Sequence, residues 1–249
     1  MLFLLLAVSA LAAQVEKGSI HIKNGTVLTV TNGIMENADV VIENGLITRI
    51  GKNLKTPSGA KVVDATGQFV MPGIIDAHSH IALDAVNEAT HPITAEVRTG
   101  DVLDPLDVGI YRALAGGVTA THAMHGSANA IGGQCETIKL RYGTYDPEEL
   151  KMEGAPRTIK FALGENPMRV HGEGSGLHAR TRMGIEQVFR RAFSEARDYM
   201  AAQEDYNKKM ASDPQAVPPM YDRRMEALAD ILRGDIIIHC HSYRADEIL

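Results

Sequence analysis

Clusters of positive charge are missing from this sequence of 249 residues. No run of Lys and Arg is longer than a pair, and the formal net charge is −6 at pH 7. Proteins that bind the nucleic-acid backbone need concentrated positive charge on one surface. We therefore expect no nucleic-acid partner.

Two catalytic signatures are also missing. The sequence has no Gly-x-Ser-x-Gly segment, which would place a serine nucleophile on a sharp turn. It has no Gly-x-x-x-x-Gly-Lys segment either, which would cradle phosphates. These absences argue against a serine hydrolase and against a P-loop nucleotide-binding protein.

Cysteine is scarce, and long apolar runs are limited to one. Cys135 and Cys240 lie in segments typical of two separate buried strands, so free thiols are favoured over a disulfide. Residues 1–13 form an apolar run that is too short to span a bilayer, and its Ala10-Leu11-Ala12 fits a cleavage site. The positive charges that usually precede such a run are absent, which indicates an upstream start or an atypical signal.

From this run we predict a signal peptide at residues 1–13. The protein would be exported, periplasmic or extracellular, without a stable membrane anchor. A buried first strand or helix is the alternative interpretation of the same residues.

Short apolar runs separated by Asn-Gly pairs occupy residues 14–68. Asn24-Gly25, Asn32-Gly33 and Asn44-Gly45 each follow a run rich in β-branched residues. Asn-Gly between such runs is a strong signal for a hairpin turn. We predict a small antiparallel β domain over this segment.

Residues 69–249 alternate predicted strands with predicted helices, which indicates an α/β protein and a (β/α) barrel. Asp104-Pro105 would cap and open the first helix, and Gly116-Gly117 would end it. Eight strands close such a barrel, and five are predicted here. The predicted strands are Val70–His80, Val118–Thr121, Gln134–Tyr142, Thr158–Asn166 and Asp235–Ser242, and the predicted helices are Asp104–Ala115, Arg182–Lys209 and Met220–Leu232, with a further helix beginning at Ala245.

The first of these strands carries the main candidate site. Asp76, His78 and His80 follow one another at intervals of two residues, so an extended strand projects all three to one side. Two imidazoles on one face can hold a divalent metal ion. The alternative is a pair of ordinary histidines at a strand end.

The segment from 70 to 80, Val-Met-Pro-Gly-Ile-Ile-Asp-Ala-His-Ser-His, resembles the first barrel strand of the amidohydrolase superfamily. The Gly-Gly-Val-Thr that follows the first helix and the β domain ahead of the barrel extend this resemblance. It implies a (β/α)8 TIM-type barrel, of which this sequence looks like the N-terminal portion, preceded by a β-sandwich domain. Gly-Gly-Val-Thr, Ile-Lys and His-Cys-His look most like the imidazolonepropionase-like and dipeptidase-related group.

The resemblance also implies a metal site. The ligands would be His78 and His80 from the first strand and His239 from the fifth. Alternation alone cannot choose between His239 and His241, since both share one strand face, and the resemblance favours His239. His241 would then be a core residue or a substrate contact. Asp76 would orient the first-strand histidines.

A two-metal site needs an anionic bridge. Lys160 lies on an otherwise apolar strand, where burial of its charge is costly. In many superfamily members a lysine at this place is carboxylated and bridges two ions, which would relieve that cost. Glu165 as the carboxylate, or a one-metal site without a bridge, are the alternatives. His122 and His125, after the second strand, are predicted as substrate contacts or structural residues.

The activity implied is hydrolysis of a C–N bond in a small-molecule amide or peptide-like substrate, with Lys160 and Asp76 as the catalytic residues. Hydroxide on one or two divalent ions, zinc or a similar metal, would attack the carbonyl. A homo-oligomer is compatible with the sequence. One alternative is an inactive amidohydrolase-like fragment or metal-binding non-enzyme. The other is a deaminase, against which Ser242 counts because a glutamate is usual at that position.

Overall fold

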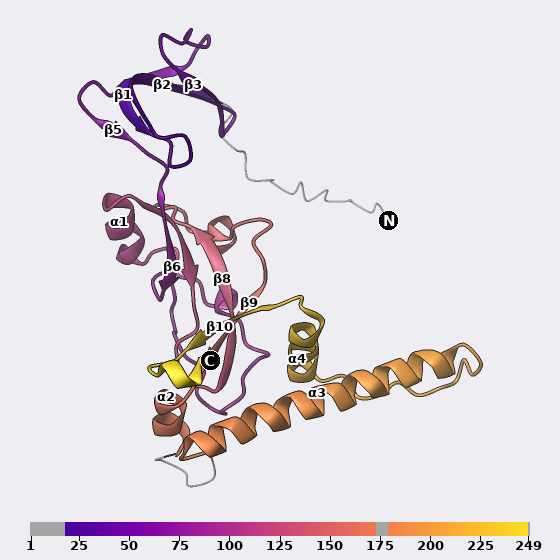
Figure 1. Cartoon of the computed structure of the whole chain (residues 1–249). Helices are drawn as coiled ribbons and strands as arrows, with labels where there is room; N and C mark the ends of the chain where they lie inside the picture. The colour runs from indigo at the N-terminus through magenta and orange to yellow at the C-terminus, as the bar shows by residue number, and fades with distance from the viewer. Residues whose placement is uncertain (1–17, 173–178, 249) are drawn as a thin grey trace, which may run out of the picture. The chain divides into compact units, whose positions relative to one another are not determined.

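The computed structural model describes residues 18–172 and 179–248, and the chain divides into two compact units, Met1–Gly73 and Ile74–Leu249 (Figure 1). The predicted signal peptide at residues 1–13 lies outside the described residues and stays a prediction. In the described part of the chain, no helix has both the length and the apolar composition that crossing a membrane requires.

The first unit is a single sheet in the order β3-β2-β1-β4, with β5 also paired to β1. β2 is antiparallel to β1 and to β3, whereas β4 and β5 run parallel to β1. The predicted antiparallel domain is therefore a mixed sheet, and the described residues do not form a second layer that would make it a sandwich. Its strands are β1 (Ser19–Leu28), β2 (Ile34–Glu43), β3 (Leu46–Gly51), β4 (Lys61–Asp64) and β5 (Phe69–Val70).

The Asn-Gly pairs behave differently from one another. Asn44-Gly45 has φ angles of 52° and 78° and joins β2 to β3 in a hairpin, as predicted. Asn24-Gly25 does not reverse the chain, so the predicted hairpin there is wrong. Asn24 alone has a positive φ, and the pairing of β1 with β2 shifts register around Gly25, so the strand bends and continues.

The second unit is an open, curled sheet in the order β10-β9-β8-β7-β6. β6, β7, β9 and β10 share one direction, but β8 is antiparallel to both of its neighbours. The expectation that the third strand belongs to a parallel series is wrong because no crossover helix separates it from β7. Its strands are β6 (Ile74–Ser79), β7 (Val118–Ala123), β8 (Ile131–Lys139), β9 (Thr158–Ala162) and β10 (Ile237–His241).

The main helices lie close to their predicted positions. The first, α1 (Val108–Ala115), is capped by Asp107, whose side chain accepts a hydrogen bond from the Gly109 amide, so the prediction that Asp104 caps it is wrong. Asp104 instead closes a turn by accepting from the Leu106 amide. The other α-helices are α2 (Glu165–Pro167), α3 (Arg182–Met210) and α4 (Arg223–Arg233). Short 3-10 turns lie at Thr99–Asp101 and Pro147–Leu150, and a π-helical turn at Met168–Gly172. The helix predicted to begin at Ala245 is a 3-10 turn, Ala245–Glu247.

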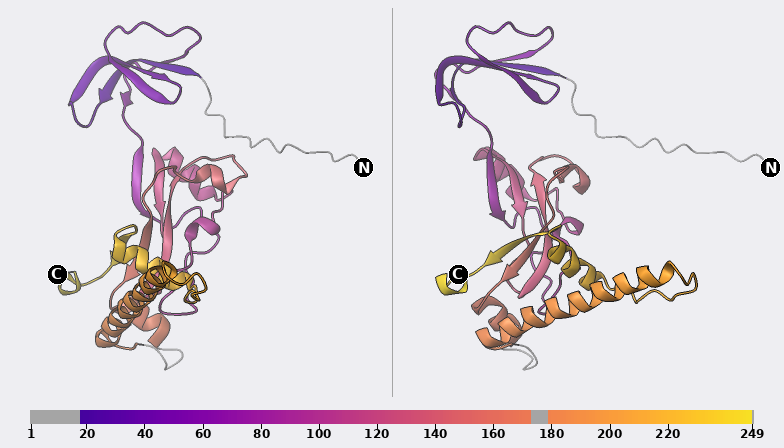
Figure 2. Two further views of the ribbon diagram at one scale, coloured as in Figure 1. Left: turned by 90° about the vertical axis from the view of Figure 1, so that its right-hand side faces the viewer. Right: turned by 45° about the vertical axis from the view of Figure 1, so that its right-hand side comes forward.

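One hydrophobic core cluster of the second unit lies between the sheet and the helices α3 and α4, and another contains Ile110 of α1 and Ile138 of β8. Ile159 and Phe161 of β9 pack against Ala192 of α3 and Leu228 of α4, all of them buried. The C-terminal part of α3 extends beyond the sheet, as Figure 1 and the right-hand view of Figure 2 show. Only the first half of this helix therefore contributes to the core.

Both edge strands of the curled sheet expose apolar side chains. Ile75 on β6 is 69% exposed, and Ile237 on β10 is 50% exposed. Cys240 on β10 is exposed as well, whereas Cys135 on β8 is buried, so the expectation of two buried cysteines is wrong for Cys240. Both thiols are free, as predicted.

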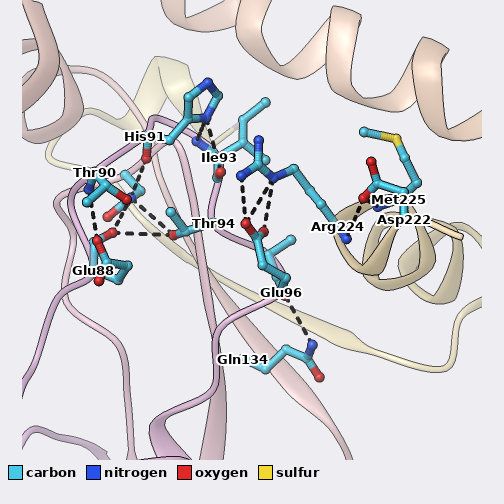
Figure 3. A network of polar contacts seen from close by, with 12 residues as sticks. Glu88, Thr90, His91, Ile93, Thr94, Glu96, Gln134, Asp222, Arg224 and Met225 are labelled. Carbon is cyan, nitrogen blue, oxygen red and sulfur yellow. Dashed lines mark hydrogen bonds and ion pairs between the residues drawn. The ribbon is translucent and has the colours of Figure 1, made fainter.

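The long segment between β6 and α1 is held in place by β8 and α4. Residues 92–98 run alongside the first half of β8, with bridges at Ile93–Ile131 and Arg98–Gln134. The guanidinium of Arg224 donates two-pronged hydrogen bonds to the Glu96 carboxylate at 2.6–3.2 Å (Figure 3). This loop therefore has a fixed path over the sheet.

Glu96→Gln is expected to lower the free energy of unfolding by about 1–2 kcal/mol at pH 7. Burial alone would raise the pKa of Glu96, but the hydrogen bonds from Arg224 outweigh it and hold the pKa below the usual 4.5. The charge pair therefore stabilises the protein fully above pH 4.5, and this stability is lost as the pH falls through the folded-state pKa.

Urea unfolding of the wild type and Glu96→Gln at pH 7 and at pH 4 and below measures the effect. The difference between the two proteins should shrink in acid. Glu186→Gln, which removes the carboxylate of an exposed pair with Arg190, is the control and should change little. Equal stability of wild type and Glu96→Gln at pH 7 would contradict the prediction.

Candidate metal centre

The end of β6 fixes the first pair of candidate ligands. The Asp76 carboxylate accepts a hydrogen bond from the backbone amide of His78 at 3.1 Å. Nδ1–H of His80 donates to the carbonyl oxygen of Met124 at 2.8 Å, because a carbonyl can only accept. This bond fixes the tautomer of His80 and leaves its Nε2 for a metal ion.

Lys160 is the middle residue of β9, which lies between β8 and the edge strand β10. Its side chain is only 2% exposed, and its Nζ lies 3.3 Å from Nε2 of His78. Burial lowers the pKa of the amine. In the described residues no carboxylate forms an ion pair with Lys160, so this buried group lacks a counter-charge.

β10 places two histidines beside β9. In the parallel register His239 is paired with Lys160, and His241 with Ala162. Burial, followed by the charge of Lys160, lowers the pKa of both histidines. His239 is therefore level with the lysine, and His241 lies nearer the carboxyl edge of the sheet.

The pKa of His78 is affected by the same neighbouring residues. Its pKa is lowered first by burial, then by the charge of Lys160, with a smaller contribution from His80. The rings of His78 and His80 meet edge to face, with centroids 5.2 Å apart. The predicted residues of three strands are thus gathered around Lys160.

His122 lies next to these residues but already has partners. Its Nε2 lies 2.7 Å from the Thr158 hydroxyl, and its ring centroid is 4.5 Å from that of His239. Burial, with a further contribution from His239, lowers its pKa to about 4. His122 is therefore neutral at pH 7, and its ring packs against that of His239.

His125 is tied to the backbone through both ring nitrogens. Its Nδ1–H donates to the Gly126 carbonyl at 3.0 Å, and its Nε2 accepts from the Glu88 amide at 2.9 Å. A side-chain carbon at Gly132 would lie 2.8 Å from Nδ1, so the glycine makes room for the ring. This geometry favours the structural role among those predicted for His125.

Glu165 lies at the start of α2 with an exposed side chain, 3.7 Å from Arg169. Its exposure contrasts with the burial of Lys160, so Lys160 is the better placed of the two bridging candidates. Sequence reasoning missed Thr158, which contacts His122, and Asn166, whose Nδ2 lies 3.5 Å from Nε2 of His241. Alternation along β9 places Thr158 on the same face as Lys160 and would have identified it.

Imidazole nitrogens together with an anionic oxygen ligand would suit a divalent metal ion such as zinc. Without a lysine-derived ligand, no three His, Cys, Asp or Glu side chains of residues 18–172 and 179–248 converge closely enough to hold an ion. Lys160 is central to the cluster and lacks a counter-charge. A carbamate on its Nζ would supply the missing anionic oxygens. A cavity of about 670 Å³ is lined by Arg157 and Thr158, among others, and none of the predicted metal ligands lines it.

Comparisons with known proteins agree on one group of relatives. The chain is 35% identical over 235 residues to "Amidohydrolase tasK" of Hapsidospora irregularis, covering 84% of this chain and 24% of the relative. It is 34% identical over 152 residues to a dihydroorotase of Trichlorobacter lovleyi, covering 61% of this chain and 31% of that protein. No family model matches the chain.

The fold has a solved counterpart. The structure of an amidohydrolase from Thermotoga maritima matches with a TM-score of 0.83 and 38% identity, and the match covers 92% of this chain and 59% of that one. The chain thus spans a quarter to a third of these two curated relatives and three fifths of the solved chain.

Proposed function

Because the chain belongs to the amidohydrolase superfamily, we propose that it forms the metal-binding part of a (β/α)8-barrel hydrolase that cleaves an amide C–N bond in a small molecule. The observation that carries this proposal is the position of Lys160. It is buried, lacks a carboxylate partner in the described residues, lies 3.3 Å from His78 and is level with His239.

In this proposal His78, His80, His239 and a carboxylated Lys160 hold one or two divalent ions, with zinc as the expected metal. A bound ion would polarise the amide carbonyl and lower the pKa of water toward about 7. The lowered pKa of Lys160 favours the neutral amine that carboxylation needs. Nζ bonds to the carbon of CO2, and the proton that it loses passes to solvent.

The other side chains prepare this centre. Asp76 fixes the end of β6 through the His78 amide, and Met124 holds the His80 ring with Nε2 free. These contacts keep both imidazoles in place before a metal binds, which strengthens binding because less freedom is lost. Asp76 thus positions ligands and does not move a proton.

The substrate proposed is a cyclic or peptide-like amide. The names of two relatives, dihydroorotase and dihydropyrimidinase, refer to ring compounds and support a cyclic amide. The predicted imidazolonepropionase-like and dipeptidase-related assignment fits the same chemistry and stays a prediction.

The test is hydrolysis of dihydrouracil, hydantoin, dihydroorotate and N-acetyl amino acids by metal-free protein before and after addition of zinc. Zinc-dependent ring opening or release of acetate is expected, with one or two ions bound per chain by elemental analysis. Zinc binding without turnover would favour the non-enzyme alternative. Cytosine is tested in the same way, and release of ammonia from it without hydrolysis of the amides would favour the deaminase.

A further inference from the structure

A second polar site lies beside the histidine cluster. It is a pocket of about 450 Å³ formed by the segments that follow β6, β7 and β9, three strands whose carboxyl ends share one edge of the sheet. Nδ2 of Asn166 in this pocket lies 3.5 Å from Nε2 of His241, so the pocket adjoins the predicted metal centre. We call it the Arg169 pocket; its lining residues are Asn87, Ser127, Ala128, Asn166, Arg169 and Val170.

The wall formed by Asn87 is held in a defined position. Any side chain at Gly126 would overlap the Asn87 amide, so glycine is required there for Asn87 to pack as it does. The Asn87 carbonyl oxygen accepts a hydrogen bond from the Ala128 amide at 3.3 Å. This contact orients the amide, and its NH2 group forms no hydrogen bond with another described residue, so it can donate to a ligand.

Among the described residues that line the pocket, hydrogen-bond donors are abundant and no carboxylate occurs. Arg169 is the one cation of this set, and the amides of Asn87 and Asn166 and the Ser127 hydroxyl can donate as well. Among residues 18–172 and 179–248, the one ion pair of Arg169 is with Glu165, at 3.7 Å and with both side chains more than half exposed. Such a pair contributes little, so the guanidinium is free to turn to a ligand.

We propose that the Arg169 pocket binds a carboxylate of the substrate, so that the preferred substrates are amides bearing a carboxylate beside the bond that is cleaved. A guanidinium matches a carboxylate with two parallel hydrogen bonds, which explains the excess of donors over acceptors. The position next to His241 places such a group at the edge of the reacting centre. This inference rests on the proposed function and names its substrate class.

The experiment compares two substrates that differ only in this group, an N-acetyl amino acid and its carboxamide, with zinc-loaded wild type, Arg169→Gln and Arg169→Lys. For the carboxylate substrate, Arg169→Gln should lose about 10–100-fold in kcat/KM, mainly through KM, as expected for loss of a charged hydrogen bond. For the carboxamide the change should stay below about twofold. The kcat/KM of Arg169→Lys for the carboxylate substrate should lie between those of wild type and Arg169→Gln. Lysine keeps the positive charge but cannot form the two parallel hydrogen bonds of a guanidinium.

Arg190→Gln is the matched control. Arg190 is 69% exposed against 66% for Arg169, and it also pairs with a glutamate four residues earlier. It lies on α3 outside the pocket and should leave both substrates unaffected. An equal loss for both substrates with Arg169→Gln, or no loss, would overturn the inference.

A second readout separates this inference from the proposed function. Binding of acetate and N-acetylglycine to metal-free protein is measured by NMR titration, with acetamide and N-acetylglycinamide as neutral probes. Binding of the acids that Arg169→Gln weakens would support the pocket even if hydrolysis is never observed. Hydrolysis by the wild type with equal binding of acids and amides would refute the pocket and leave the proposed function standing.

Discussion

Lys160→Met is expected to abolish metal-dependent hydrolysis and, at the same time, to make the metal-free protein more stable. The activity should fall at least about 1000-fold, because the proposed carbamate ligand cannot form on methionine and several kcal/mol of charge stabilisation would be lost with it. The variant should also bind less zinc per chain by elemental analysis. Unchanged zinc content and activity would contradict the role of Lys160.

The gain in stability has a separate physical cause. Methionine fills the space of the lysine chain but has no charge to bury, and Lys160 has neither exposure nor a carboxylate partner in the described residues. We expect the metal-free variant to be more stable by about 1–3 kcal/mol at pH 7 in urea unfolding. Lys151→Met, which removes a partly exposed lysine paired with Glu148, should show no gain and serves as control.

The pH dependence tests this cause. Burial lowers the folded-state pKa of Lys160 below its usual 10.5, so the unfolded chain binds more protons between these two values. The stability of the metal-free wild type therefore rises with pH in that window, toward 10.5. The advantage of Lys160→Met should shrink over the same window. A constant difference from pH 7 to pH 10.5 would assign the gain to packing instead.

Local signals in the sequence predicted much of the fold. α3 and the end of α4 follow from amphipathic spacing and from Gly234, which has a φ of 86° and closes α4. The hairpin at Asn44-Gly45 follows from its turn chemistry. Each of these features depends on residues that are neighbours in the chain, so a sequence is enough to predict it.

The direction of β8 depends on the rest of the sheet and was not predictable in this way. Its residues alternate as a strand should, but alternation is the same for parallel and antiparallel strands. The length of the connection was the better signal, because only seven residues separate Ala123 from Ile131 and they contain no helix. The exposure of Cys240 also depends on the sheet, since β10 lies at its edge.

Some features of the candidate site could likewise be predicted from the sequence, and others could not. The burial of Lys160 was predicted from its apolar strand, and the structure confirms it. Its approach to His78, 82 residues away in the chain, was implied only by the family resemblance. The backbone contacts that occupy both nitrogens of His125 come from two loops, and loop contacts cannot be predicted from periodic patterns in the sequence.

His239→Asn is the change expected to have the next largest effect, and it decides between the two histidines of β10. His239 is level with Lys160, and its ring rests against His122, which is itself held by Thr158. A ligand held in this way should matter more than His241. We expect His239→Asn to lower kcat/KM about 1000-fold and to weaken zinc binding strongly.

His241→Asn should retain activity within about 10-fold, because His241 lies one pair beyond Lys160, near Asn166 and the Arg169 pocket. Its loss should appear mainly in KM for carboxylate substrates, since that pocket would lose its neighbour. Zinc titration calorimetry and steady-state kinetics on both variants, with His78→Asn as the reference for loss of a ligand, separate the two roles. A large loss of zinc affinity in His241→Asn together with a small one in His239→Asn would reverse the assignment.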